Sequence, residues 1–125
     1  SEAEDFGLTN ALQEKNFEKA MGLLNKHLAH GDAPEQILGS ISSQFRLIWG
    51  VQSCLAQGLS QDQIAKEIEV HPYRVKMAMK NARKFSTQQL RNCYSELVKA
   101  DRSIKSTSDR EGIMETLLIN LFRLI

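Results

Sequence analysis

Apolar residues recur at intervals of three and four along almost the whole chain. One clear run includes Phe17, Leu24 and Leu28, whose spacing places these side chains on one side of an α-helix, facing a core. No segment sustains the alternation of apolar and polar residues that a half-buried β-strand needs. The two prolines, Pro34 and Pro72, leave long stretches free to be helical. The pattern predicts an all-α fold.

Residues suited to helix ends divide the chain into about seven expected helices. Five side chains can accept a hydrogen bond from the first turn of a following helix: Asn16, Asp32, Ser60, Ser86 and Asp109. Gly31 and Gly58 suit the ends of the second and third helices. The first helix is expected at residues 3–13, with Phe6 and Leu12 in the core, and the fifth after Pro72. We expect one compact helical bundle that forms a single domain, residues 1–125.

Charged residues are divided unevenly along the chain. Residues 1–69 carry ten acidic and five basic side chains, whereas residues 70–125 carry five acidic and eleven basic ones. The net charge of +1 therefore combines an acidic half with a basic half, which suits a protein–protein contact at least as well as a nucleic-acid contact. No apolar run approaches the roughly 20 residues of a membrane-spanning helix, so no membrane contact is expected.

The sequence shows no arrangement typical of a catalytic or metal centre. Cys54 and Cys93 fall on apolar helical lines and lack metal-ligand spacing, which also fits a reducing, cytoplasmic setting. His27 and His30 lie three residues apart without an evident third ligand, so both are expected at the surface. A phosphate-binding GxxxxGK[ST] loop is absent from the sequence. We expect no enzymatic activity, no metal and no cofactor.

Residues 61–83 have the pattern of a helix-turn-helix unit. Ala65 is small enough to let two helices pack closely, and the second helix would present polar side chains outward, as in proteins that enter the major groove. These side chains could contact DNA or a protein partner: His71, Tyr73, Arg74, Lys76, Lys80, Arg83 and Lys84. Glu69 stands where the turn usually has glycine, and no early Asn or Gln is placed to read adenine. A basic, solvated helix face is the alternative interpretation, and His71, which precedes Pro72 at a helix start, could instead cap that helix.

The seventh expected helix carries more apolar residues than one buried side needs. Leu118, Phe122 and Ile125 lie beside its main apolar stripe and are candidates for an interface between subunits. A well-buried last helix is the alternative. On the sixth expected helix, Asp101 and Lys105 are one turn apart in the favourable order for an ion pair.

Three segments, residues 40–60, 63–86 and 96–106, follow one another with local motifs in a definite order and spacing. Together with residues 11–34 they resemble the C-terminal collar domain of bacterial DNA polymerase III delta subunits, which are clamp-loader components. The resemblance covers nearly the whole chain. The motif positions that it marks as structural are Phe45, Arg46, Pro72, Val75, Phe85, Asp101 and Lys105.

The resemblance implies a function in assembly. Full-length delta subunits resemble AAA+ ATPase subunits without hydrolysing ATP, and their N-terminal region binds the sliding clamp; this chain would be the C-terminal domain of such a longer subunit. Their C-terminal domain joins those of the delta-prime and gamma/tau subunits in a collar, so these subunits are the expected partners, and any DNA contact is expected to be weak or indirect. The alternatives are a helix-turn-helix DNA-binding regulator, which would discriminate among DNA sequences, and an unrelated helical adaptor.

Overall fold

The computed structural model describes residues 2–125, with side chains from Gly7 onward. Over these residues the chain forms seven helices and no strand: α1 (Glu2–Gln13), α2 (Phe17–His30), α3 (Pro34–Ala56), α4 (Gln61–Glu67), α5 (Pro72–Ala82), α6 (Thr87–Ser106) and α7 (Arg110–Leu124). The expected all-α bundle of about seven helices is therefore confirmed. The side chain of Phe6, expected in the core, lies outside the described side chains.

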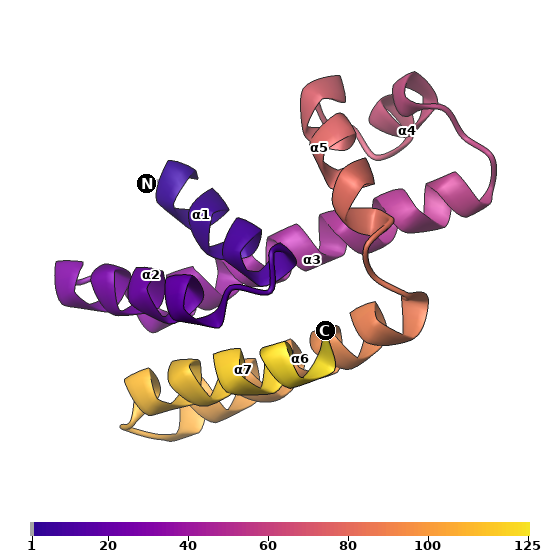
Figure 1. The fold of residues 1–125 in the computed structure, drawn as a ribbon. Coiled ribbons are helices and arrows are strands. Elements are labelled where there is room, and N and C mark those ends of the chain that lie inside the picture. The colour runs from indigo at the N-terminus through magenta and orange to yellow at the C-terminus, as the bar shows by residue number, and fades with distance from the viewer. Residues whose placement is uncertain (1) are drawn as a thin grey trace.

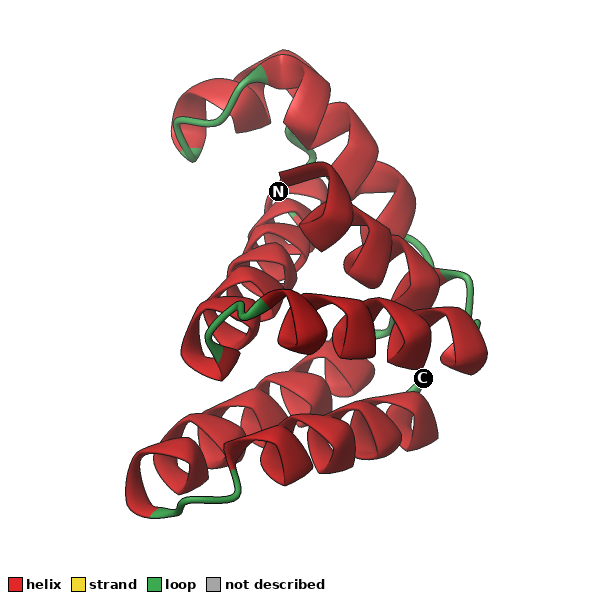
Figure 2. Ribbon diagram, turned by 90° about the vertical axis from the view of Figure 1, so that its left-hand side faces the viewer, coloured by secondary structure: helices red, strands yellow, loops and turns green. Residues whose placement is uncertain are grey.

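Helix α3 is the element around which the others are arranged. It contacts α1, α4, α5, α6 and α7, and α6 and α7 also pack against each other. Figure 1 shows α4 and α5 projecting beside the C-terminal part of α3, while α6 and α7 return along it as a hairpin. Figure 2, turned by 90°, shows the same hairpin below α2. Burial on several sides matches the apolar residues found all around α3.

The helices begin largely where the capping residues predict. Asn16 and Asp109 each accept a hydrogen bond from the first turn of their helix. Ser60 and Ser86 form reciprocal capping boxes with Gln63 and Gln89. In the second box, the Gln89 backbone N–H donates to Ser86 Oγ at 3.0 Å, while the Ser86 N–H donates to Gln89 Oε1 at 2.9 Å.

The prediction that Asp32 caps α3 is wrong. Ala33 occupies the N-cap position and makes no side-chain hydrogen bond. The Asp32 carboxylate instead accepts hydrogen bonds from His27 and His30. Pro34, in the first turn, has no N–H to satisfy, which reduces the need for a cap at this end.

Four helices end in a left-handed residue followed by a backbone hydrogen bond that reaches back to the last turn, the Schellman arrangement. Gly31 and Gly58 supply that residue after α2 and α3, with φ of 96° and 81°. Lys15 and Glu69 supply it after α1 and α4, with φ of 58° and 55°. Glu69 therefore adopts the conformation that glycine usually provides, and the tight turn between α4 and α5 is retained.

One continuous core receives side chains from all seven described helices. Phe45 and Phe85 pack with ring centroids 6.4 Å apart, and Val75 is fully buried. The Gln52 side-chain amide donates to the backbone carbonyls of Ala82 and Phe85 at 3.1 and 2.7 Å. These contacts fix the C-terminal end of α5 against α3.

At the other end of α3, Arg110 forms an ion pair with Glu35, and this hydrogen-bonded guanidinium holds the pKa of the Glu35 carboxyl below its usual value. The pair connects the first turn of α7 to the first turn of α3. Among the described helices, none combines the length and apolar character needed to cross a membrane.

We expect Glu69→Gly to stabilise the chain by about 0.5–1 kcal/mol, because relief of the left-handed strain outweighs the entropy that glycine adds to the unfolded state. Chemical denaturation measures the difference. Lys66→Gly is the matched control, since Lys66 lies inside α4; it should destabilise by up to about 1 kcal/mol. Destabilisation by both substitutions would contradict the assignment of strain to Glu69.

Candidate functional site

An apolar surface lies where α2 and α7 meet. Phe17 of α2 packs edge-to-face against Phe122 of α7, with ring centroids 5.1 Å apart, yet Phe17 remains 40% exposed. Ile119, one turn before Phe122, is 39% exposed, and Ile125, one turn after it, is half-buried. We call these four residues the α2–α7 apolar patch. Grouped exposed side chains of this kind are typical of a surface that binds another protein.

This patch differs from the sequence-based candidates at three positions. Leu118 is fully buried in the domain's own core, so it cannot contribute to an exposed surface. Phe17, expected in the core, is exposed because it begins α2, at the edge of the contact between α2 and α7. Ile119 was missed because it lies off the main apolar stripe of the last helix. Phe122 and Ile125 remain partly accessible.

A hollow of about 260 Å³, which we call the α3–α6 hollow, is a second candidate surface and lies between α3 and α6. Arg46 of α3 and Asp101 of α6 both line it, beside Tyr94 and the exposed Val98. Tyr94 also packs edge-to-face against Trp49, with ring centroids 5.8 Å apart. Accessible Arg, Tyr and Trp side chains are common in the energetically important parts of protein interfaces.

The motif positions expected to be structural divide into two groups. Phe45, Val75 and Phe85 are buried, as a structural role requires. The others are exposed: Arg46, Pro72, Asp101 and Lys105. Pro72 fits the first turn of α5, and Lys105 forms the expected ion pair with Asp101 at 2.9 Å. Arg46 has no structural role in the core, so its position in the α3–α6 hollow favours recognition of a partner.

Helix α5 and the residues just after it present a row of exposed side chains, mostly basic, to solvent. The row lies on the side opposite the buried Val75, Ala78 and Ala82. Its members follow one another at helical spacing, and we call them the α5 basic stripe: Tyr73, Lys76, Lys80, Arg83 and Lys84.

Two residues expected in the same cluster have other positions. His71 caps α5, its Nδ1 accepting the Tyr73 backbone N–H at 3.1 Å. Arg74 is exposed but lines a small cavity with Asn10 of α1 and Asn81, away from the stripe. The structure therefore brings together only part of the predicted basic cluster.

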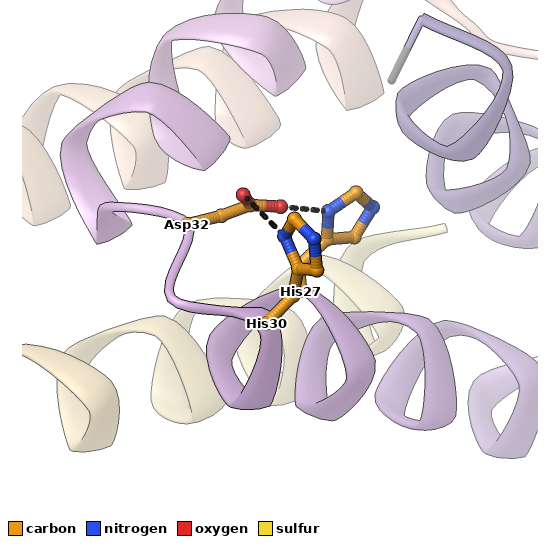
Figure 3. A network of polar contacts seen from close by, with 3 residues as sticks. All are labelled: His27, His30 and Asp32. Atoms are coloured by element: carbon orange, nitrogen blue, oxygen red, sulfur yellow. Dashed lines mark hydrogen bonds and ion pairs between the residues drawn. The ribbon is translucent and has the colours of Figure 1, made fainter.

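The two histidines of α2 share one carboxylate. His27 Nδ1 lies 2.7 Å from Asp32 Oδ2, and His30 Nδ1 lies 3.2 Å from Asp32 Oδ1 (Figure 3). These hydrogen bonds hold the pKa of the Asp32 carboxyl below its usual value. His30 is exposed, but His27 is buried, so the prediction that both are surface residues is wrong for His27. The contact was missed because Gly31 turns the chain back and brings Asp32 over the end of α2.

A groove of about 550 Å³ runs between α6 and α7. Glu96 lines this groove, and its carboxylate accepts hydrogen bonds from the side chains of Lys99 and Asn120. Nearby, burial raises the pKa of the Cys93 thiol to about 11, and the Glu96 charge adds to the shift. Cys93 is therefore a protonated, unreactive core residue at neutral pH. Within residues 7–125, no group of three His, Cys, Asp or Glu side chains could hold a metal ion.

The described residues form surfaces suited to binding other molecules. Comparison with known proteins assigns the chain to a family. Residues 2–121 match the family described as "DNA polymerase III delta subunit, C-terminal domain". The chain is 34% identical to DNA polymerase III subunit delta of Bacillus subtilis over 119 residues, which cover 94% of this chain and 34% of that protein. This chain belongs to the family formed by the C-terminal domains of DNA polymerase III delta subunits.

The fold of this delta C-terminal domain agrees with that assignment. The solved structure of the Bacillus subtilis DNA clamp loader delta protein superposes with a TM-score of 0.90 at 33% identity, covering 96% of this chain and 36% of that one. The chain thus spans about a third of the length of the relatives it matches. Family membership favours a clamp-loader component over the helix-turn-helix regulator considered from sequence.

In this delta C-terminal domain, Asp32→Asn should lower stability at neutral pH. Because the folded-state pKa of Asp32 lies below its ordinary value of 3.8, the charged carboxylate stabilises the fold above that pH, and this stabilisation is lost as pH falls through the lowered pKa. The difference in denaturation midpoint between the natural chain and the variant should therefore shrink as the pH falls below 3.8, the ordinary pKa of this carboxyl.

The control is His30→Gln, which removes the longer and more exposed of the two contacts to Asp32. It should lower the midpoint at neutral pH less than Asp32→Asn does. Equal midpoints for the natural chain and Asp32→Asn at neutral pH would contradict a stabilising role for the carboxylate.

Proposed function

We propose that this delta C-terminal domain is a non-catalytic assembly module of the bacterial replicative clamp loader, acting in the cytoplasm. In this proposal it joins the delta subunit to the delta-prime and gamma/tau subunits in a collar, as part of loading the sliding clamp onto DNA. Binding of the clamp itself belongs to the N-terminal region of the longer delta subunit.

The observation that carries the proposal is the exposed α2–α7 apolar patch on a member of this family. Water contact with Phe17 and Ile119 is unfavourable, and a neighbouring protein surface would remove it. Phe17 and Phe122 are already held in one geometry by their ring contact, so little side-chain freedom is lost on binding. A rigid aromatic pair of this kind suits the centre of an interface.

A subunit inside a ring of different subunits needs two contact surfaces, one toward each neighbour. The α3–α6 hollow is a suitable second surface, because it lies at a different helix junction from the α2–α7 patch. Val98 offers exposed apolar area there, and Arg46 and Asp101 offer opposite charges that can orient a partner helix. We propose that each surface receives a helical face of one neighbouring subunit.

The proposal is tested by placing one lysine in each surface. Ile119→Lys and Val98→Lys should each weaken binding to delta-prime or to gamma/tau about tenfold or more, because burying the new charge costs more than about 1.4 kcal/mol. Both positions are 39% exposed, so the domain itself should still fold. Binding is measured by calorimetry with each purified partner, and folding is checked by circular dichroism.

Gln57→Lys is the matched control. Gln57 is exposed at the end of α3, and its replacement adds the same charge outside both surfaces. It should leave both affinities unchanged. If each surface contacts a different neighbour, the two surface variants should also differ in which partner they lose. Unchanged affinity in both Ile119→Lys and Val98→Lys would overturn the proposed docking surfaces.

A further inference from the structure

The α5 basic stripe has no use in the docking described above, and its chemistry points to a different ligand. Its four cations, Lys76, Lys80, Arg83 and Lys84, form no ion pair with any described residue. By contrast, Lys99 and Lys105 on α6 are paired with Glu96 and Asp101.

Like charges one turn apart on a helix destabilise it slightly, and acidic neighbours would remove that cost. No acidic residue occurs between Glu69 and Glu96. The stripe therefore presents concentrated positive charge that the chain does not neutralise, which suits a polyanion.

The stripe also contains an aromatic ring in an unusual position. Tyr73 is 63% exposed, the most exposed of the large hydrophobic side chains described. It lies at the first turn of α5, where the His71 cap fixes the backbone. A ring that lies open beside a row of cations is the combination by which proteins hold single-stranded nucleic acid, with bases stacking on the ring and phosphates meeting the cations.

Reading of a duplex through its major groove is less well supported. Asn81, the amide side chain on α5, lines the small cavity between α1, α3 and α5 and so lies away from the exposed stripe. The side chains best suited to adenine are therefore missing from the outer side of the helix. The lysines can still hold phosphates, which carry no sequence information.

We propose that the α5 basic stripe binds single-stranded DNA without sequence preference, with Tyr73 stacking on a base and the four cations contacting the backbone. From Tyr73 to Lys84 the stripe extends about 16 Å at 1.5 Å per residue. At the roughly 3.4 Å spacing of a stacked strand, that length spans at most about five nucleotides. Helix α5 packs chiefly on α3 and α4 and projects from the rest of the molecule, which leaves this side accessible (Figure 1).

The test measures binding of this chain to a fluorescent oligothymidylate of about 20 nucleotides and to a mixed-sequence duplex of equal length, by anisotropy across salt concentrations. With four phosphate contacts, log K for the single strand should fall against log salt with a slope of about −3. Replacing all four cations by glutamine should weaken binding about 100-fold or more at about 0.1 M salt and flatten the slope.

The matched control removes the same charge from another face, with Arg91, Lys99, Arg102 and Lys105 on α6 changed to glutamine. It should keep most of the affinity. Tyr73→Ala should weaken single-strand binding about fivefold or more while leaving duplex binding unchanged, and Tyr73→Phe should retain it. Circular dichroism confirms that each variant is folded.

Three results would overturn the proposal. Equal losses in the two glutamine variants would show general charge attraction in place of a site. Duplex binding as tight as single-strand binding, with no effect of Tyr73→Ala, would assign the stripe to duplex phosphates. Competition by polyglutamate as effective as that by unlabelled oligothymidylate would assign it to an acidic protein segment.

Discussion

Burial of α3 on several sides is the constraint on which the rest of the structure depends. Ile41, Ile48 and Val51 are almost completely removed from water, and five other helices pack around this one. Because α3 occupies the centre, the remaining helices can place only their inward sides against it. Their other sides are left for solvent or partners, which explains why the candidate binding surfaces lie at helix junctions and on the projecting α5.

The helices and most of their ends could be predicted because they depend on neighbours in sequence. A capping box such as Ser86 with Gln89 involves residues three apart, and a left-handed glycine such as Gly31 ends a helix regardless of tertiary packing. Asp32 was wrongly predicted to cap α3 because its carboxylate can accept hydrogen bonds either from the first turn of α3 or from the histidines of α2. The buried His27 ring, 2.7 Å away, provides a stronger partner than the first turn of α3.

The candidate surfaces were harder to predict, because exposure depends on which helices meet. Leu118 and Ile119 are neighbours in sequence with similar hydrophobicity, yet one is completely buried and the other is 39% exposed. A helix turns about 100° per residue, so the positions of α2, α3 and α6 relative to α7 decide between them. The α5 basic stripe was predicted more fully, since an acid-free helix opposite Val75 and Ala78 has one side available to solvent, but only the structure separates Arg74 and the capping His71 from it.

The α2–α7 apolar patch and the α5 basic stripe are structurally independent of each other. The α2–α7 patch lies at the junction of two helices, and within it Phe122 packs against the core, whereas Ile119 is exposed. The α5 basic stripe lies on the outer side of a helix that packs chiefly on α3 and α4, and its side chains are exposed. Substitutions that change the charge of α5 should therefore leave the proposed docking surfaces unaltered. The proposed docking surfaces and the proposed nucleic-acid site could therefore be occupied at the same time, because neither contact requires the other surface to move.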